Sequence, residues 1–122
     1  MQIIRRIYNK IFPQYVNELE KAVNGYKSLL DLGCGSDSPI KSFSNKLYSV
    51  GIDIFKANII KSREKKIHNK YYLMSVLGID KRFKKNSFDC VLASDLIEHL
   101  NKEDGEKLIK KMDKIAKKCI II

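Results

Sequence analysis

Cysteine is scarce in this sequence, which also contains neither a long apolar run nor an internal repeat. The three cysteines, Cys34, Cys90 and Cys119, are odd in number and share no metal-ligand spacing, which argues against a disulfide framework and a zinc site. No apolar run reaches the roughly 18–20 residues of a membrane span, and no apolar stretch typical of a signal peptide lies near the N-terminus. We therefore expect a cytoplasmic protein with reduced thiols, no bound metal and no membrane span.

Low-complexity stretches and interdomain linkers are absent as well. With 122 residues, of which 44% are hydrophobic, the chain can build one core but not two. We expect a single domain over residues 1–122. Residues 1–26 are expected to form an N-terminal helical cover, and residues 27–122 the core.

Acidic residues are in the minority, with 14 against 24 basic ones, and the net charge is +10. A basic face would attract a nucleic acid. The lysines, however, are spread along predicted helices without interleaved aromatic residues. The run at 110–118 fits a solvated helix face, on which Glu106 and Lys110 pair at i, i+4. A nucleic-acid partner is therefore an alternative that we do not favour.

Apolar segments of strand length alternate with segments of helical periodicity, which predicts an α/β fold with a mostly parallel sheet. The expected strands are 28–33, 47–54, 71–76, 88–94 and 119–122. The expected helices are 2–12, 14–24, 39–45, 56–67 and 102–117. The first two helices form the cover, and an alternative places side chains of this region at a substrate entrance: Arg5, Arg6, Tyr8 and Tyr15.

The segment Leu-Asp-Leu-Gly-Cys-Gly-Ser-Asp at 30–37 carries the strongest functional signal. An apolar strand runs into Asp-x-Gly-x-Gly, where the two glycines let the turn bend tightly and bring bare amides against a ligand. Ser38 and Pro39 then suit the N-cap and the first position of a helix. Strand, glycine turn and helix N-terminus together predict a site for a carboxylate or phosphate of a nucleotide-type ligand.

A second acid, Asp53, ends the next apolar strand, 20 residues after Gly33. A doubly wound fold places its ribose-binding carboxylate at about this distance. The glycine turn distinguishes a dinucleotide from other adenosine-containing ligands. A dinucleotide fingerprint needs a third glycine where this chain has Ser38, and a dinucleotide has no group that calls for a carboxylate at Asp31. An acid at Asp31 suits a ligand with an ammonium group. A nucleotide-linked oxidoreductase is thus a disfavoured alternative.

Three motifs follow one another in the chain: Asp-Leu-Gly-Cys-Gly at 31–35, Val-Gly-Ile-Asp at 50–53, and Asn-Ser-Phe-Asp-Cys-Val-Leu-Ala-Ser-Asp-Leu-Ile-Glu-His-Leu at 86–100. Together they resemble the class I S-adenosylmethionine-dependent methyltransferases of the type 11 group, from about Lys27 to the end. The resemblance implies a Rossmann-like, doubly wound, mostly parallel sheet of about five strands with helices on both faces.

The same resemblance implies S-adenosylmethionine as the cofactor. It also implies transfer of the methyl group, by in-line displacement at the sulfonium, to an acceptor that the sequence does not identify. Matching the motifs residue by residue places these positions at the cofactor: Asp31, Leu32, Gly33, Cys34, Gly35, Asp53, Ile54, Ser75, Val76, Ser94 and Asp95.

Within the third motif, the resemblance places Ser94 and Asp95 in the loop beside the transferred methyl group. Asp95 and His99 are the candidate catalytic groups, His99 because an imidazole can act as a general base. The Glu-His-Leu segment occurs in family members with unrelated substrates, so the favoured role of His99 is to anchor a loop by hydrogen bonding. His68 is interpreted as a loop residue.

The chain departs from the family pattern in two places. It ends within a fifth strand, whereas family members continue into further strands. We therefore expect a truncated or partial chain whose exposed C-terminal strand edge favours a homodimer. Where the family has an Asp for the adenine amino group, this chain has Ser75, a weaker neutral acceptor, and Asp80 is an alternative. A cofactor-binding or degenerate module without catalytic activity is the resulting alternative function.

Overall fold

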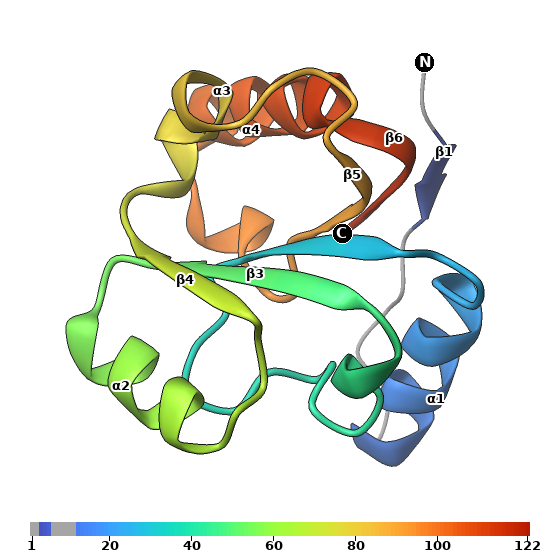
Figure 1. The fold of residues 1–122 in the computed structure, drawn as a ribbon. Helices are drawn as coiled ribbons and strands as arrows, with labels where there is room; N and C mark the ends of the chain where they lie inside the picture. The colour runs from blue at the N-terminus through green and yellow to red at the C-terminus, as the bar shows by residue number, and fades with distance from the viewer. Residues whose placement is uncertain (1–2, 6–11) are drawn as a thin grey trace.

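The computed structural model describes residues 3–5 and 12–122, and its centre is a six-stranded parallel sheet (Figure 1). The strands are β1 (Ile3–Arg5), β2 (Ser28–Leu32), β3 (Tyr48–Asp53), β4 (Lys70–Leu73), β5 (Phe88–Leu92) and β6 (Ala116–Ile121). They lie in the order β1-β6-β5-β2-β3-β4, so the winding reverses between β2 and β5. The predicted Rossmann-like, doubly wound fold is confirmed, and open sheets of this kind bind their ligands at the carboxyl ends of the central strands.

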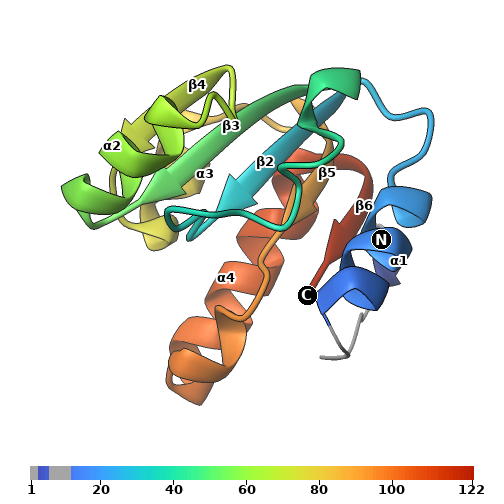
Figure 2. The same ribbon diagram turned by 90° about the horizontal axis from the view of Figure 1, so that it is seen from below.

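Helices cover both faces of this sheet (Figures 1 and 2). They are α1 (Phe12–Ala22), α2 (Lys56–Glu64), α3 (Ile79–Arg82) and α4 (Lys102–Ile115). The described residues also contain three single turns of 3-10 helix. They are η1 (Ser44–Lys46) before β3, η2 (Val76–Gly78) after β4 and η3 (Ile97–His99) after β5. The first two helices lie on one face, and α3 and α4 lie on the other. None of the helices in the described ranges is long and apolar enough to cross a membrane.

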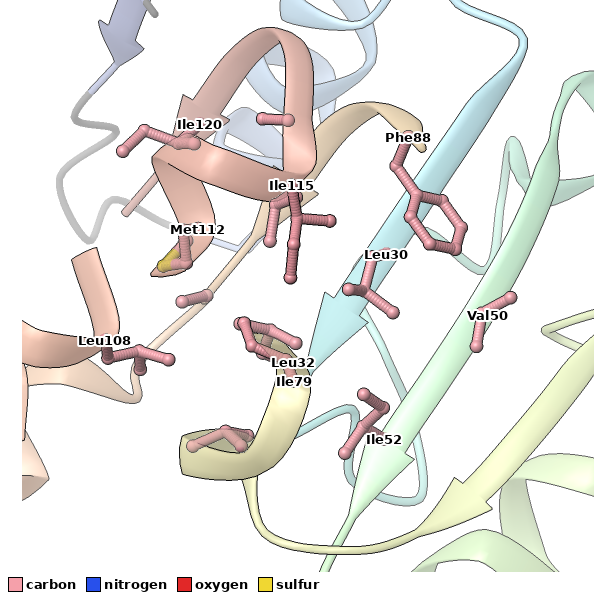
Figure 3. Packing of buried hydrophobic residues seen from close by; sticks show 14 residues of the cluster. Leu30, Leu32, Val50, Ile52, Ile79, Phe88, Leu108, Met112, Ile115 and Ile120 are labelled. Atoms are coloured by element: carbon pink, nitrogen blue, oxygen red, sulfur yellow. The ribbon is translucent and has the colours of Figure 1, made fainter. Parts of the chain in front are cut away.

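Strand alternation divides the apolar residues between two cores. Leu30 and Leu32 of β2 point toward α4, where they pack in one cluster with Met112 and Ile115 (Figure 3). Leu29 points the other way and joins the cluster under α1. Each fully buried Leu side chain contributes roughly 1.5–3 kcal/mol relative to an exposed one.

The same alternation decides where the polar strand residues point. Asp31 lies between Leu30 and Leu32, so its side chain is on the face covered by α1 and α2. Asp53 follows Ile52, which also points toward α4, and is therefore on the same face as Asp31. Both carboxylates thus reach the carboxyl edge of the sheet from one side.

The helix expected over 2–12 is wrong at Ile3–Arg5, which form β1. Residues 2 and 6–11 lie outside the described residues, and with them Arg6 and Tyr8 of the alternative substrate entrance. β1 pairs with β6 from Ile3 opposite Cys119 to Arg5 opposite Ile121. The apolar pattern of this segment fits a strand as well as a helix, and the unpaired backbone of β6 decides in favour of the strand. The homodimer expected through an exposed C-terminal strand edge loses its basis, because β1 occupies that edge.

The helix expected over 39–45 is wrong as well. Residues 39–43 form successive turns, with bonds from the Lys41 amide to the Ser38 carbonyl at 3.1 Å and from the Phe43 amide to the Ile40 carbonyl at 3.0 Å. Only η1 follows. The Ser38 hydroxyl donates to Asp31 at 2.6 Å, and its oxygen accepts from the Ile40 amide at 3.3 Å. It thus caps the first of these turns, and the glycine turn is not followed directly by a helix N-terminus. The remaining expected elements are present, with ends shifted by at most three residues.

Ser49 in β3 has a fully buried hydroxyl without a hydrogen-bond partner among the described residues. Because an unpaired buried hydroxyl costs free energy, we expect Ser49→Ala to raise the free energy of unfolding by about 1 kcal/mol. Urea denaturation measures the change. Ser62→Ala is the matched control: its hydroxyl is buried and bonded to the Tyr71 hydroxyl at 2.6 Å, so this variant should be less stable. A loss of stability in Ser49→Ala would contradict the prediction.

Candidate functional site

The glycine turn follows directly on the carboxyl end of β2. Gly33 and Gly35 both have a φ of +65°, in the left-handed region that favours glycine. A Cβ built on Gly33 would meet the Leu96 side chain at 3.4 Å, whereas a Cβ on Gly35 would meet nothing within 4 Å. The backbone of Gly35 is thus open to an approaching molecule. The turn is fixed to β3, because the Cys34 amide donates to the Ile52 carbonyl at 2.9 Å.

Asp53 joins the glycine turn to the end of β3. Its Oδ2 accepts from the Gly35 amide at 2.9 Å, and its Oδ1 accepts from the Phe55 amide at 2.8 Å. Asn58 of α2 adds a side-chain donor at 3.4 Å. The residue is 6% exposed, so these donors compensate the buried charge and set the direction of the carboxylate. The acid that the sequence predicts to be functional is thus a carboxylate held in a fixed direction at the carboxyl end of β3.

Asp31, in β2 before the glycine turn, is held by two hydrogen-bond partners. Its Oδ2 lies 2.6 Å from the Ser38 hydroxyl and 2.8 Å from Nε2 of His68. The pair of Asp31 and His68 is buried. Sequence reasoning placed His68 in a loop and missed this contact, because the two residues are 37 positions apart and only the β2–β3–β4 arrangement brings them together.

Ser94 follows β5 and is bonded to α1. Its hydroxyl lies 2.5 Å from the Tyr15 hydroxyl, which α1 brings to the carboxyl edge. Burial raises the pKa of Tyr15 above its usual value, and the bond to Ser94 opposes this rise. Nearby carboxylates raise the pKa of Tyr15 further: Asp95, Asp31 and Glu98. Tyr15 is thus a protonated hydroxyl at neutral pH, surrounded by the acids of the site.

Asp95 is exposed and has a φ of 53°, a left-handed conformation that Asp tolerates better than most residues. This bend turns the chain from β5 toward η3. His99 stands at the end of η3 and is exposed, where the expectation was a hydrogen-bonded loop anchor. Within the third motif, the only helical turn is η3 itself, over Ile97–His99.

Where the adenine is expected to bind, the chain has the neutral Ser75 in place of a carboxylate. Ser75 is exposed and caps η2, with its hydroxyl accepting from the Leu77 amide at 3.2 Å. The Asp80 carboxylate, the alternative acceptor, is paired with Lys111 of α4 at 3.4 Å. Ile54, directly after Asp53, is 60% exposed and available for an apolar contact.

Three of the expected cofactor residues turn their side chains into the protein. Leu32 and Val76 belong to the core cluster under α4, so only their backbones reach the site. Cys34 lies beneath the turn, where its sulfur is 3.0 Å from the place of a Cβ on Gly51. Burial raises the pKa of the Cys34 thiol well above its ordinary value, with Asp31 and Asp53 adding to the shift. Cys34 is therefore an unreactive packing residue.

A basic side chain also braces the turn from outside. Lys65, beyond α2, donates to the Ser36 carbonyl at 3.0 Å and pairs with Asp37 at 3.4 Å. The expectation of a glycine turn did not include this contact. Solvent-exposed pairs of this kind contribute roughly 0–1 kcal/mol.

A cavity also lies away from this site, at the other edge of the sheet. This cavity of about 540 Å³ is lined by Lys27 and Tyr48, which stand at the amino ends of β2 and β3. It opens at the opposite edge of the sheet, whereas ligands of open α/β sheets bind at the carboxyl edge. In the part of the chain that the structure describes, no group of three or more His, Cys, Asp or Glu side chains could hold a metal ion.

A family model described as a methyltransferase domain matches residues 30–119 of the chain. This range begins in β2 and ends in β6, and it includes the glycine turn, Asp53, Ser94 and Asp95. No curated protein matches the chain in sequence.

Solved structures share the fold. An S-adenosylmethionine-dependent methyltransferase from Archaeoglobus fulgidus is 22% identical, with a TM-score of 0.69 over 87% of this chain and 48% of that one. Magnesium protoporphyrin IX methyltransferase from Synechocystis, solved with bound S-adenosylmethionine, is 18% identical, with a TM-score of 0.69 over 86% and 52%. The cyclase SpnF is 16% identical, with a TM-score of 0.70 over 85% and 40%. The chain spans about half the length of these proteins or less.

Proposed function

Since the chain belongs to the family of methyltransferase domains, we propose that it binds S-adenosylmethionine at the carboxyl edge of the sheet and transfers its methyl group to an acceptor. The binding site consists of the glycine turn after β2, the acid at the end of β3, and the segment after β5. The cytoplasmic location expected from the sequence is part of this proposal.

One observation carries the proposal: the bond from the Gly35 amide to Asp53. It places a ribose-type acceptor directly beside a bare backbone turn, 2.9 Å from the amide nitrogen. A Cβ on Gly35 would meet nothing within 4 Å, which leaves room for a ligand to approach the backbone of the turn. β2 and β3 are adjacent, parallel strands of one sheet, so the glycine turn and Asp53 at their ends lie side by side.

Each side of the site offers a different chemistry. Asp53 accepts hydrogen bonds from the ribose hydroxyls, and Asp31 accepts from the ammonium group at the methionine end. Ile54 gives apolar surface to the adenine, and Ser75 supplies a neutral hydroxyl where the family pattern has a carboxylate. Leu32, Cys34 and Val76 contribute backbone only.

When bound, S-adenosylmethionine supplies a methyl group already activated by its sulfonium. The protein then has to align the acceptor and exclude water, and positioning of this kind can lower a barrier by roughly 7–11 kcal/mol. Tyr15 and Ser94 form a hydrogen-bonded pair of hydroxyls just after the carboxyl end of β5. Because the pKa of Tyr15 is raised, its hydroxyl holds its proton at neutral pH and serves to bind rather than to remove a proton.

A second function is favoured by one observation at Ser75. Its hydroxyl already accepts from the Leu77 amide, and a neutral acceptor binds the adenine amino group more weakly than a carboxylate does. Such a weakened site is compatible with a domain that binds S-adenosylmethionine but does not transfer its methyl group. The two functions share the ligand and differ only in turnover.

Calorimetric titration tests the ligand. We expect saturable binding of S-adenosylmethionine and no binding of NAD, because the third glycine of a dinucleotide turn is replaced by Ser38, whose hydroxyl is bonded to Asp31. Binding of NAD alone would contradict the proposal. Transfer of a radiolabelled methyl group into a cell extract then separates the enzyme from the binding module, since only the enzyme labels an acceptor.

A further inference from the structure

We propose that His68 is a positioning residue of the cofactor site, which orients Asp31 so that this carboxylate holds the ammonium group of the ligand. The inference rests on the proposed function, because it assigns Asp31 to the methionine end of S-adenosylmethionine. His68 lies in the loop between α2 and β4, and its side chain contacts the Asp31 carboxylate.

The contact is short and dry. Nε2 of His68 is 2.8 Å from Oδ2 of Asp31, and the two side chains are 0% and 2% exposed. An ionised carboxylate can only accept, so Nε2 carries the proton of this bond. The Ser38 hydroxyl donates to the same oxygen at 2.6 Å. Two donors on Oδ2 fix the rotation of the carboxylate, and Oδ1 is then the oxygen that can accept from a ligand.

The far side of the imidazole is also held. Nδ1 of His68 lies 3.2 Å from the Tyr71 hydroxyl and 3.4 Å from the Ser62 hydroxyl. The two hydroxyls are 2.6 Å apart, and the His68 amide donates to the Tyr71 oxygen at 3.1 Å. Either hydroxyl can donate to Nδ1, so a neutral ring with its proton on Nε2 has partners on both nitrogens. With a partner on each ring nitrogen, the imidazole is fixed in the orientation in which it supports Asp31.

The neighbouring strand makes room for this arrangement. Gly51 of β3 is the register partner of Asp31. A Cβ at this position would stand 3.1 Å from Cγ of His68 and 3.1 Å from Cδ1 of Tyr71. The missing side chain is therefore the space through which the imidazole reaches the carboxylate. The glycine of the Val-Gly-Ile-Asp motif thus leaves the space that the His68 ring needs.

The test compares two ligands that differ only at the methionine end. S-Adenosylhomocysteine carries the ammonium group, whereas 5′-methylthioadenosine has the same adenosine and a thioether without it. We expect His68→Leu to lower the affinity for S-adenosylhomocysteine about tenfold, since Asp31 loses the donor that orients it. The affinity for methylthioadenosine should stay within about twofold of that of the unaltered chain. His68→Gln keeps a side-chain N–H donor and should recover most of the loss. Calorimetry measures all four affinities against the unaltered chain.

Two further variants keep the test decisive. Tyr71→Phe removes the hydroxyl at Nδ1 while leaving the ring and His68 in place, so it carries the same expectation if His68→Leu fails to fold. Tyr72→Phe is the matched control, because the next tyrosine of the same strand packs on Phe83 and should change neither affinity. Equal weakening of both ligands, or an unchanged affinity for S-adenosylhomocysteine, would overturn the role of His68 alone. An unaltered chain that binds neither ligand would overturn the proposed function together with it.

Discussion

Asp53→Ala weakens the binding of S-adenosylmethionine at least a hundredfold; this is the largest effect that we expect at the site. The substitution removes two hydrogen bonds to the ribose from a charged acceptor, each contributing roughly 1.5–3 kcal/mol, and 1.4 kcal/mol corresponds to a factor of ten. It also frees the Gly35 amide, whose bond to Oδ2 holds the glycine turn against β3. Calorimetric titration of the variant measures the loss.

Two controls accompany this variant. Asp53→Asn keeps one oxygen of similar position and removes the charge, so its affinity should lie between those of the unaltered chain and Asp53→Ala. Glu103→Ala removes a charge of the same sign on α4, where Glu103 forms an exposed pair with Lys107, and should leave the affinity unchanged. An affinity of Asp53→Ala within about threefold of the unaltered chain would show that the ligand does not use this carboxylate.

Gly51→Ala is expected to give the largest loss of stability among single methyl additions at the site. The new Cβ would stand 3.0 Å from the Cys34 sulfur, 3.1 Å from His68 and 3.1 Å from Tyr71, closer than ordinary contacts allow. Rings and strand backbone have to move, and overpacking of this kind costs roughly 1–3 kcal/mol. We expect the free energy of unfolding, measured in urea, to fall by about 2 kcal/mol.

Gly78→Ala is the matched control for this substitution. Gly78 has a negative φ of −98°, and a Cβ there would meet only Met74, at an ordinary distance of 3.6 Å. The variant should be within about 0.5 kcal/mol of the unaltered chain or slightly more stable, because alanine restricts the unfolded state. Adding Cys34→Ala to Gly51→Ala should restore part of the loss, since one of the three close contacts is removed. Equal stability of the Gly51→Ala and Gly78→Ala variants would contradict the crowding at Gly51.

The distribution of apolar residues was sufficient to predict most of the sheet. The strands around Leu30, Ile52 and Val91 are buried on both faces, and such segments read as apolar runs whatever their neighbours are. The glycine turn was predictable for a related reason: Gly33 and Gly35 occupy left-handed conformations that few other residues adopt.

The segments that sequence reasoning placed wrongly are those whose conformation depends on a distant partner. Ile3–Arg5 form a strand because β6 offers unpaired backbone groups at that edge. Residues 39–43 form turns, and the Ser38 hydroxyl before them is bonded both to Asp31 in β2 and to the Ile40 amide. Local periodicity contains neither fact, and in both cases the competing helix was compatible with the same residues.

The sequence by itself determined the doubly wound core, the glycine turn and the positions of Asp31 and Asp53, because these depend on residue type and on spacing along one strand and the next. The tertiary structure alone decided which side chains surround the two acids. His68 meets Asp31, and Tyr15 meets Ser94, across 37 and 79 residues of chain. Contacts of that separation result from strand order and from the face on which each helix packs, so no local pattern in the sequence records them.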